Sequence, residues 1–254
     1  TTTTLLIFDI LNKAGLDVAL AGNVGQSFAL QVAEDPHDYY VIELSSFQLD
    51  DMYHFQADIA VLLNITPDHL DRYQHNMEMY VASKLRITQN QTPNENFIYC
   101  QDDENIVNKI GHLPGHPALI PFSQEKVLEQ GAYLEDKKRI VVRIKNRGVT
   151  MELDELSLKG KHNVYNSMAA SISGSVLNIR KEVIRDSLKN FQGVEHRLEP
   201  VLRVHGMEFI NDSKATNVNS SWFALESMEN KVIWIAGGID KGNDYSMLTE
   251  LVKD

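Results

Sequence analysis

Short apolar runs alternate with amphipathic stretches along the first hundred residues of the chain. An apolar stripe over residues 4–14 predicts a helix, with a threonine available to cap its start and Gly15 suited to its end. Further helices are predicted over residues 26–33 and 76–90, and strands over residues 18–21, 39–44, 59–65 and 97–100. Because the run at 39–44 is apolar, β-branched or aromatic at most positions, it predicts a central parallel strand covered on both faces.

The pattern changes over residues 119–158. Short apolar runs separated by charged turns predict an antiparallel, hairpin-rich region there, with strands at 132–134, 139–144 and 149–153. Helices return at 162–177 and 181–190, a hinge is expected at 193–200, and a hairpin is predicted around His205 and Gly206. A helix over 217–228 and a strand over 232–236 begin a new β/α unit. The predicted fold class is therefore α/β, with a mostly parallel sheet and a small antiparallel portion.

The composition is that of an ordinary globular protein. The 254 residues suffice for one large domain or two modest ones, and 43% of them are hydrophobic and 23% charged. A single cysteine excludes an internal disulfide framework and a cysteine-rich zinc site. No apolar run reaches the roughly 18 residues of a membrane span, and 24 basic against 35 acidic residues exclude an overall basic nucleic-acid footprint. We therefore expect a soluble, cytoplasmic protein that binds neither nucleic acid nor membrane.

Polar segments follow several predicted strands, where ligands bind in open parallel sheets. Glu43 ends the most apolar strand and could hold Mg²⁺ opposite the phosphates of a nucleotide, although a solvated acid is a common alternative. The segment 64–72 combines two acids, His69 and an arginine, which suit Mg²⁺ or Mn²⁺ as well as a surface turn. Lys84 lies among apolar neighbours, and on its own it is more typical of a lysine whose stem packs on an apolar surface.

Two later segments could hold an anion or a purine. Residues 211–217 form a predicted strand-to-helix junction that carries Lys214 and Thr216, which suits a phosphate or carboxylate, with an elaborate helix cap as the alternative. Asn163 and Asn166 share one helix face, so their amides could clasp a purine or a phosphate, or could simply cap the helix. The four threonines that open the chain are similar to the downstream edge of a phosphate loop, whose glycines and lysine are not in this sequence.

Taken in order, these segments resemble the Mur ligases, ATP-dependent amide-forming enzymes of peptidoglycan precursor synthesis. The discriminating segments are 43–49 (ELSSFQL) and 211–217 (NDSKATN), with support from 22–25, 64–72, 83–87, 160–166 and 196–197. Within the family they most resemble members that add D-glutamate. The resemblance implies a P-loop-type mononucleotide-binding domain over residues 1–193, followed by the start of a Rossmann-like, amino-acid-binding domain over 194–254. Both ends of the chain are thus expected to be cuts through a longer protein.

The resemblance also implies a reaction and its residues. ATP would convert the carboxylate of UDP-N-acetylmuramoyl-L-alanine into an acyl phosphate, which the amine of D-glutamate then attacks. Two Mg²⁺ ions are implied, with Glu43, His69 and a carbamylated Lys84 as ligands, and with Lys84, His69 and Lys214 as catalytic residues. ATP contacts are implied for Thr1, Thr2, Asn163, Asn166, Arg197 and Asp212, and substrate contacts for Asn23, Ser45, Thr216 and Lys241. The full-length protein is expected to be a monomer whose partners are small molecules.

Two alternatives stay open. The first is another Mur ligase or a folylpolyglutamate synthetase, which the residues at 43–49 and 212–217 disfavour. The second is that the polypeptide as it stands is a non-catalytic, weakly nucleotide-binding module, because the glycines and the lysine of the phosphate loop are missing.

Overall fold

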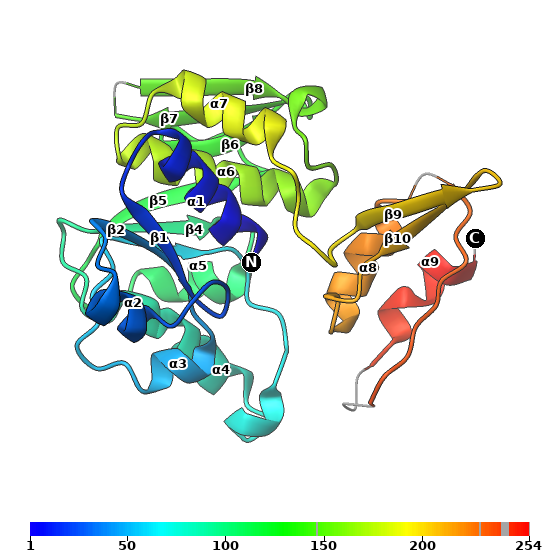
Figure 1. Ribbon diagram of the computed structural model, residues 1–254. Helices are drawn as coiled ribbons and strands as arrows, with labels where there is room; N and C mark the ends of the chain where they lie inside the picture. Colours follow the sequence, from blue (N-terminus) through cyan, green and yellow to red (C-terminus); the bar gives the residue numbers. More distant parts are fainter. Residues whose placement is uncertain (146, 229, 240–243, 254) are drawn as a thin grey trace.

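The larger part of the structure is an α/β body built around a six-stranded sheet (Figure 1). This computed structural model describes residues 1–145, 147–228, 230–239 and 244–253. The strands are β3 (Ile59–Leu62), β4 (Asn96–Cys100), β5 (Ala118–Ser123), β6 (Gly131–Glu135), β7 (Arg139–Ile144) and β8 (Arg147–Glu152), adjacent in that order. Strands β3 to β6 run parallel to one another, and β7 and β8 continue the sheet from β6 in antiparallel pairing. The predicted mixture is confirmed, although β5, for which no strand was predicted, lies in the region expected to be antiparallel and pairs in parallel with both neighbours.

A separate two-stranded parallel sheet carries Glu43. It consists of β1 (Val18–Gly22) and β2 (Tyr39–Glu43), and Gly22 pairs with Glu43 at its end. The prediction that β2 is a central strand is wrong in the part of the chain that the structure describes, since β1 is its only ladder partner there. Val41 is the only one of its five residues that is buried.

Helix α6 (Lys161–Val176) lies between the sheet and two further helices, α1 (Thr2–Lys13) and α7 (Lys181–Asn190) (Figure 1). Its small residues allow close packing: a Cβ on Gly174 would meet Ile10 and Ile184 at 3.1 Å. Three of its buried serines, Ser171, Ser173 and Ser175, donate their hydroxyls to carbonyls four residues earlier, so these donors are satisfied within the helix. This packing fixes the first turn of α1 against the first turns of α6.

The remaining helices of the body are short and border the sheet edges. They are α2 (Phe28–Glu34), α3 (Ser46–Asp50), α4 (Met77–Leu85) and α5 (Glu104–Ile110), with 3₁₀ turns at Leu70–Tyr73, Arg86–Thr88 and Leu153–Glu155. The predicted helix over 76–90 is thus divided into α4 and a 3₁₀ turn. The Asp103 carboxylate caps α5 by accepting from Ile106 N at 3.1 Å.

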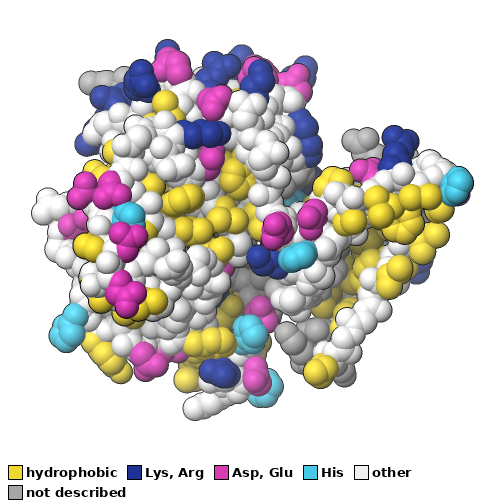
Figure 2. All heavy atoms as spheres, viewed as in Figure 1, with side chains coloured by type: hydrophobic (Ala, Val, Ile, Leu, Met, Phe, Trp, Pro, Cys, Tyr) yellow, Lys and Arg dark blue, Asp and Glu magenta, His cyan; other side chains and the backbone are white. Residues whose placement is uncertain are grey.

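The smaller part begins with a hairpin of β9 (Glu199–Val204) and β10 (Met207–Asn211) and continues with α8 (Val218–Glu226), a 3₁₀ turn at Ser246–Leu248 and α9 (Thr249–Lys253). The predicted turn at His205 and Gly206 is confirmed, and both residues have positive φ. The strand predicted over 232–236 is wrong: this segment has no ladder partner among the described residues, and Ile233 and Ile235 are 86% and 92% exposed. Figure 2 shows apolar side chains gathered along the hairpin as well.

No helix within the described residues is long and apolar enough to cross a membrane. The domain division expected at residue 193 stays a prediction.

Candidate active site

A cleft of about 420 Å³ lies where the first turn of α1, the loops after β3 and β4, the start of α6 and residues 197–224 meet. Five of the six residues predicted to contact a nucleotide line it: Thr1, Thr2, Asn166, Arg197 and Asp212. These residues are far apart in the sequence, so the fold has brought the predicted nucleotide set together. The sixth, Asn163, lies one helical turn from Asn166 and is hydrogen-bonded to it.

The first turn of α1 presents three threonines to different surroundings. Thr1 Oγ1 donates to Glu43 Oε1 at 3.0 Å, and Thr3 Oγ1 donates to Asn166 Oδ1 at 2.8 Å. Thr2 Oγ1 is buried and has no hydrogen-bond partner in the described structure, although Thr2 lines the cleft. A buried hydroxyl without a partner is costly, which suggests that a ligand or ion completes its bonding.

Glu43, the expected metal ligand, lies at the carboxyl end of β2, and Asn23 and Ser45, the expected substrate contacts, follow β1 and β2. The backbone N–H of Asn23 donates to the Glu43 carbonyl at 2.9 Å, and Gly22 permits this approach because a Cβ there would lie 2.2 Å from the Glu43 carbonyl oxygen. Ser45 is the N-cap of α3 and forms a capping box with Gln48. Glu43 Oε2 is buried without a hydrogen bond, although it lies 3.1 Å from the Thr1 amino nitrogen.

One cationic side chain, that of Arg197, lines the cleft next to the smaller part of the structure. Asp212 Oδ1 accepts from Leu198 N at 3.0 Å, and Lys214 N donates to the His196 carbonyl, so Arg197 is held between two anchored neighbours. Arg197 Nε is buried without a hydrogen-bond partner in the described structure. Arg197 and Thr1 line the same cleft, whereas Lys214 lies outside its lining. This end of the cleft can therefore attract an anion.

Aromatic rings line another part of the cleft. The rings of His162 and Phe223 lie 5.7 Å apart, and Tyr165 is nearby in the same lining. Burial lowers the pKa of His162, and the charge of Arg197 acts in the same direction, so the neutral imidazole is favoured. Neutral, flat rings provide a surface on which a planar ligand could stack.

The loop that carries His69 is clamped at Ile65. Asp103 Oδ2 accepts from Ile65 N at 2.8 Å, and Asn105 Nδ2 donates to the Ile65 carbonyl at 2.9 Å. Beyond the clamp, His69 adopts a left-handed backbone with φ of 51° and has an exposed ring that packs on Phe47. Sequence reasoning gave neither clamping residue a role in the site; Asp103 is the N-cap of α5, and Asn105 lies in its first turn.

Asp68 connects three parts of the site. Its carboxylate lies 3.7 Å from His69 Nε2, accepts weakly from Asn217 Nδ2 at 3.4 Å, and acts electrostatically on Lys84. The sequence pattern singled out the segment around Asp68 but gave this acid no role of its own. The role of Asp68 becomes visible only in the folded structure, where it lies close to His69, Lys84 and Asn217.

Lys84 is half-buried on α4, with Nζ 4.9 Å from the centre of the Tyr80 ring. Burial lowers the pKa of Lys84, and the charge of Asp68 offsets part of this effect. Burial, together with the charge of Asp68, raises the pKa of Tyr80 to about 12. Lys84 is thus a lysine whose neutral, nucleophilic form is more accessible than usual.

Not every predicted residue joins this arrangement. The described residues contain no group of three or more His, Cys, Asp or Glu side chains that could hold a metal ion. Lys214 and Thr216 are exposed and lie outside the lining of the cleft, beside Ala215, which is part of it. Lys241 lies outside the described residues, so its predicted contact has no structural counterpart.

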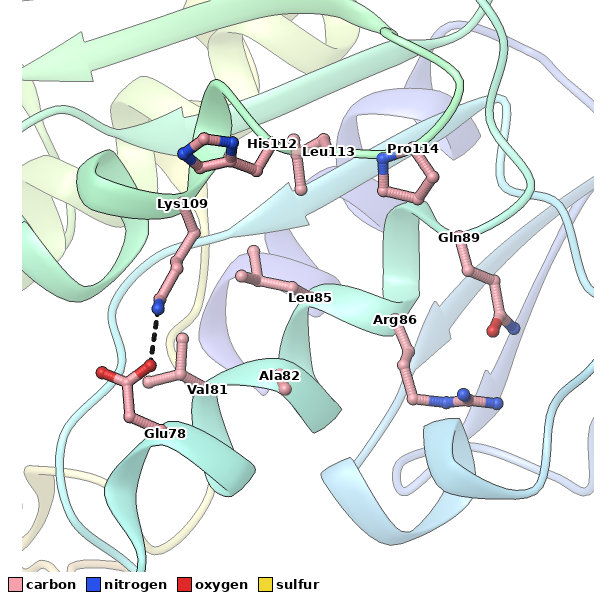
Figure 3. A pocket seen from close by; sticks show the side chains of 10 residues that line it. All are labelled: Glu78, Val81, Ala82, Leu85, Arg86, Gln89, Lys109, His112, Leu113 and Pro114. Carbon is pink, nitrogen blue, oxygen red and sulfur yellow. Dashed lines mark hydrogen bonds and ion pairs between the residues drawn. The ribbon is translucent and has the colours of Figure 1, made fainter.

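A second cavity, of about 320 Å³, lies on the side of α4 that faces α5 (Figure 3). Val81 and Leu85 line it from α4, and Lys109 of α5 forms an ion pair with Glu78 at its rim. None of the predicted site residues lines it, which separates it from the chemistry of the first cleft.

Comparison with known proteins agrees with this arrangement. The family model described as Mur ligase middle domain matches residues 1–174. Over its whole length the chain is 58% identical to the UDP-N-acetylmuramoylalanine–D-glutamate ligase of Bacteroides fragilis, of which it spans 57%. It is 53% identical to the protein of the same name from Porphyromonas gingivalis, over 99% of this chain and 56% of that one.

Solved structures share the fold at lower identity. MurF from Acinetobacter baumannii superposes with a TM-score of 0.71 at 20% identity, over 89% of this chain and 51% of that one. MurF from Thermotoga maritima, solved in complex with ADP, gives a TM-score of 0.66 at 16% identity, over 89% of this chain and 53% of that one.

The fold and the cleft define an α/β protein with a mostly parallel sheet, as predicted. The chain belongs to the Mur ligase family, which confirms the resemblance drawn from its motifs. It spans just over half the length of the curated relatives described above.

Proposed function

We propose that this chain supplies the ATP-binding part of a ligase that joins D-glutamate to UDP-N-acetylmuramoyl-L-alanine. The observation that carries the proposal is the cleft in which Thr1, Thr2, Asn166, Arg197 and Asp212 meet. Support for the particular substrates comes from the relatives described above, which are named as D-glutamate ligases and are 53% and 58% identical to this chain.

The cleft offers each part of a nucleotide a suitable surface. The rings of His162 and Phe223 can stack with a purine, and Asn166 can donate to one of its acceptor atoms. Arg197, which lines the cleft together with Thr1, can attract phosphates at the α1 end. Because phosphoryl transfer depends mainly on positioning and charge neutralisation, these residues would hold ATP for attack by the substrate carboxylate.

The residues at Glu43 fit a magnesium ion. Thr2 Oγ1 and Glu43 Oε2 are buried oxygens without hydrogen bonds, and the Thr1 hydroxyl lies between the helix and Glu43. Hard oxygen donors of this kind are the ligands that Mg²⁺ prefers. Glu43 and a threonine hydroxyl would hold the ion, which when bound would neutralise charge on the phosphates; the other ligands would come from His69, water or phosphate oxygens.

At the α4 end of the site, Lys84 would carry a carbamate on its side-chain nitrogen. Its lowered pKa makes the neutral amine available, and this amine would attack CO₂ and release a proton, so that a cation becomes an anion. The product would be a second anionic group close to Asp68 and His69, suited to a second Mg²⁺. In the following step the amine of D-glutamate would displace phosphate from the acyl phosphate, so both substrates must meet at this end.

Substrate competition tests the proposal. In the full-length protein, phosphate release from ATP should require UDP-N-acetylmuramoyl-L-alanine and D-glutamate together. D-glutamate should support turnover while meso-diaminopimelate and L-lysine should not. Turnover of a diamino acid without turnover of D-glutamate would favour a different Mur ligase, and nucleotide binding without any phosphate release would favour a non-catalytic module.

A further inference from the structure

Three buried side chains connect the first turn of α1 to the loop before α6 through a line of hydrogen bonds. Thr3 Oγ1 donates to Asn166 Oδ1 at 2.8 Å, Asn166 Nδ2 donates to Asn163 Oδ1 at 2.9 Å, and Asn163 Nδ2 donates to the Lys159 carbonyl at 2.7 Å. Thr3, Asn163 and Asn166 are 6%, 7% and 8% exposed. Water therefore has little access to these groups, and the protein must satisfy most of their bonding itself.

The Lys159 carbonyl determines the direction of the whole line. A carbonyl only accepts, so Asn163 must present its NH₂ to Lys159 and its oxygen to Asn166. Asn166 must then donate its NH₂ to Asn163, which leaves its own oxygen facing Thr3. A hydroxyl can donate or accept, and here it donates. Asn163 thus sets the orientation of the Asn166 amide, and Thr3 supplies the hydrogen bond that anchors its oxygen.

The orientation matters because Asn166 lines the cleft. With one N–H of its NH₂ group bonded to Asn163, the second N–H remains for a ligand, while its oxygen accepts from Thr3. The reversed amide would lose the bond to Asn163, whose oxygen cannot donate, although the Thr3 hydroxyl could still pair with it. The side chain at this point of the cleft therefore acts as a hydrogen-bond donor and selects an acceptor atom on the ligand.

We propose that Thr3 is a positioning residue for nucleotide recognition: its hydroxyl anchors the Asn166 amide, whose orientation Asn163 sets, so that one N–H of this amide stays in place for the bound nucleotide. This inference rests on the proposed ATP-binding function. It goes beyond the residues expected to touch ATP, because Thr3 acts through Asn166.

The experiment compares Thr3→Val, which removes the hydroxyl at nearly constant volume, with Thr3→Ser, which keeps it, in the full-length protein. The matched control is Thr4→Val, since Thr4 lies on the same helix, has no side-chain hydrogen bond in the described structure and does not line the cleft. ADP affinity by calorimetry and the KM for ATP are measured, together with kcat and the KM for D-glutamate.

Thr3→Val should weaken ADP binding and raise the KM for ATP about tenfold, equivalent to about 1.4 kcal/mol, with kcat and the KM for D-glutamate little changed. Thr3→Ser and Thr4→Val should remain close to the unsubstituted protein. In an Asn166→Ala background, Thr3→Val should have no further effect on ADP affinity, because the amide through which it acts is gone.

Unchanged ADP affinity in Thr3→Val would overturn the inference, as would an equal loss in Thr3→Ser or an undiminished loss in the Asn166→Ala background. If Thr3→Val does not fold, Thr3→Ala provides the same comparison with Thr3→Ser. Absence of ADP binding by the unsubstituted protein would instead overturn the proposed function, so the two failures are distinguishable.

Discussion

The two ends of the site are built differently. At the α1–α6 end, Thr3, Asn163 and Asn166 are buried and bonded to one another. At the α4 end, His69 is exposed, Lys84 is half-buried, and Asp68 reaches them through charge with no hydrogen bond at normal distance. Folding alone thus fixes the nucleotide end, whereas the other end holds charged groups whose interactions a metal, CO₂ or phosphate would complete.

The largest effect expected from this difference is the loss of Lys84. Lys84→Ala in the full-length protein should lower kcat by about 10²–10³, the equivalent of ~2.7–4 kcal/mol for a positioned electrostatic group. ADP affinity should be unchanged, because the nucleotide end is built independently. The rate of phosphate release measures the first effect and calorimetry the second.

Lys109→Ala is the control for that experiment. Lys109 lies in the neighbouring cavity, where it forms an exposed ion pair with Glu78, and such pairs contribute little. Turnover near the normal rate in both variants would contradict the role proposed for Lys84.

A substitution of Glu43 tests whether this carboxylate holds the magnesium ion. Glu43→Gln should raise the Mg²⁺ concentration needed for half-maximal turnover by at least about 10–100-fold, because substitution of outer-shell partners already has effects of this size and Glu43 is proposed as a direct ligand. The reason is that the amide lacks the charge that a divalent cation requires, while it can still accept from Thr1. A magnesium titration of turnover measures this effect, with Glu78→Gln as the control. An unchanged magnesium requirement would place the ion elsewhere.

Much of the fold could be predicted because local patterns determine it. The amphipathic pattern over 181–190 predicted the observed bounds of α7, and the hairpin around His205 and Gly206 followed from turn chemistry. Pairing partners are a different matter, since apolar content does not specify which strands will meet. The run at 39–44 therefore looked central but has a single partner, and the run at 232–236 has none among the described residues.

In the candidate site, too, local spacing could be predicted from the sequence, whereas contacts between distant segments could not. The spacing of Asn163 and Asn166 predicted a shared helix face, and the structure places them in hydrogen-bond contact. The bond from Thr3 to Asn166 joins residues 163 positions apart, and no local pattern encodes it. Asp68 was visible only as one acid in a polar loop, because its neighbours Lys84 and Asn217 come from other elements.

Removal of the hydrogen bond from Ile65 N to Asp103 tests how far this contact stabilises the loop that carries His69. Asp103→Ala removes both the cap of α5 and the acceptor for Ile65 N, so the free energy of unfolding should fall by about 1–2 kcal/mol. Hydrogen exchange at the Ile65 amide should accelerate more than exchange in the α1–α6 core. Urea unfolding and exchange measurements check the two effects.

Glu104→Ala serves as the control for the clamp, because Glu104 is the next residue and makes no side-chain hydrogen bond in the described structure. Its effect on stability should stay within about 0.5 kcal/mol. Equal effects of the two substitutions would mean that the clamp contributes nothing specific.

The smallest effect expected is a dependence on pH at the α4 end. Burial lowers the pKa of Lys84, so the folded state binds fewer protons than the unfolded state between that lowered pKa and the ordinary value of 10.5. Stability attributable to Lys84 should therefore rise with pH within that window, and the neutral amine should increase by up to about tenfold per pH unit below the lowered pKa. After removal of CO₂, the rate at which added CO₂ restores activity should rise with pH when dissolved CO₂ is held constant. Lys84→Ala should show no such activation, and a flat or falling profile in the unsubstituted protein would mean that the neutral amine of Lys84 does not limit assembly of this end of the site.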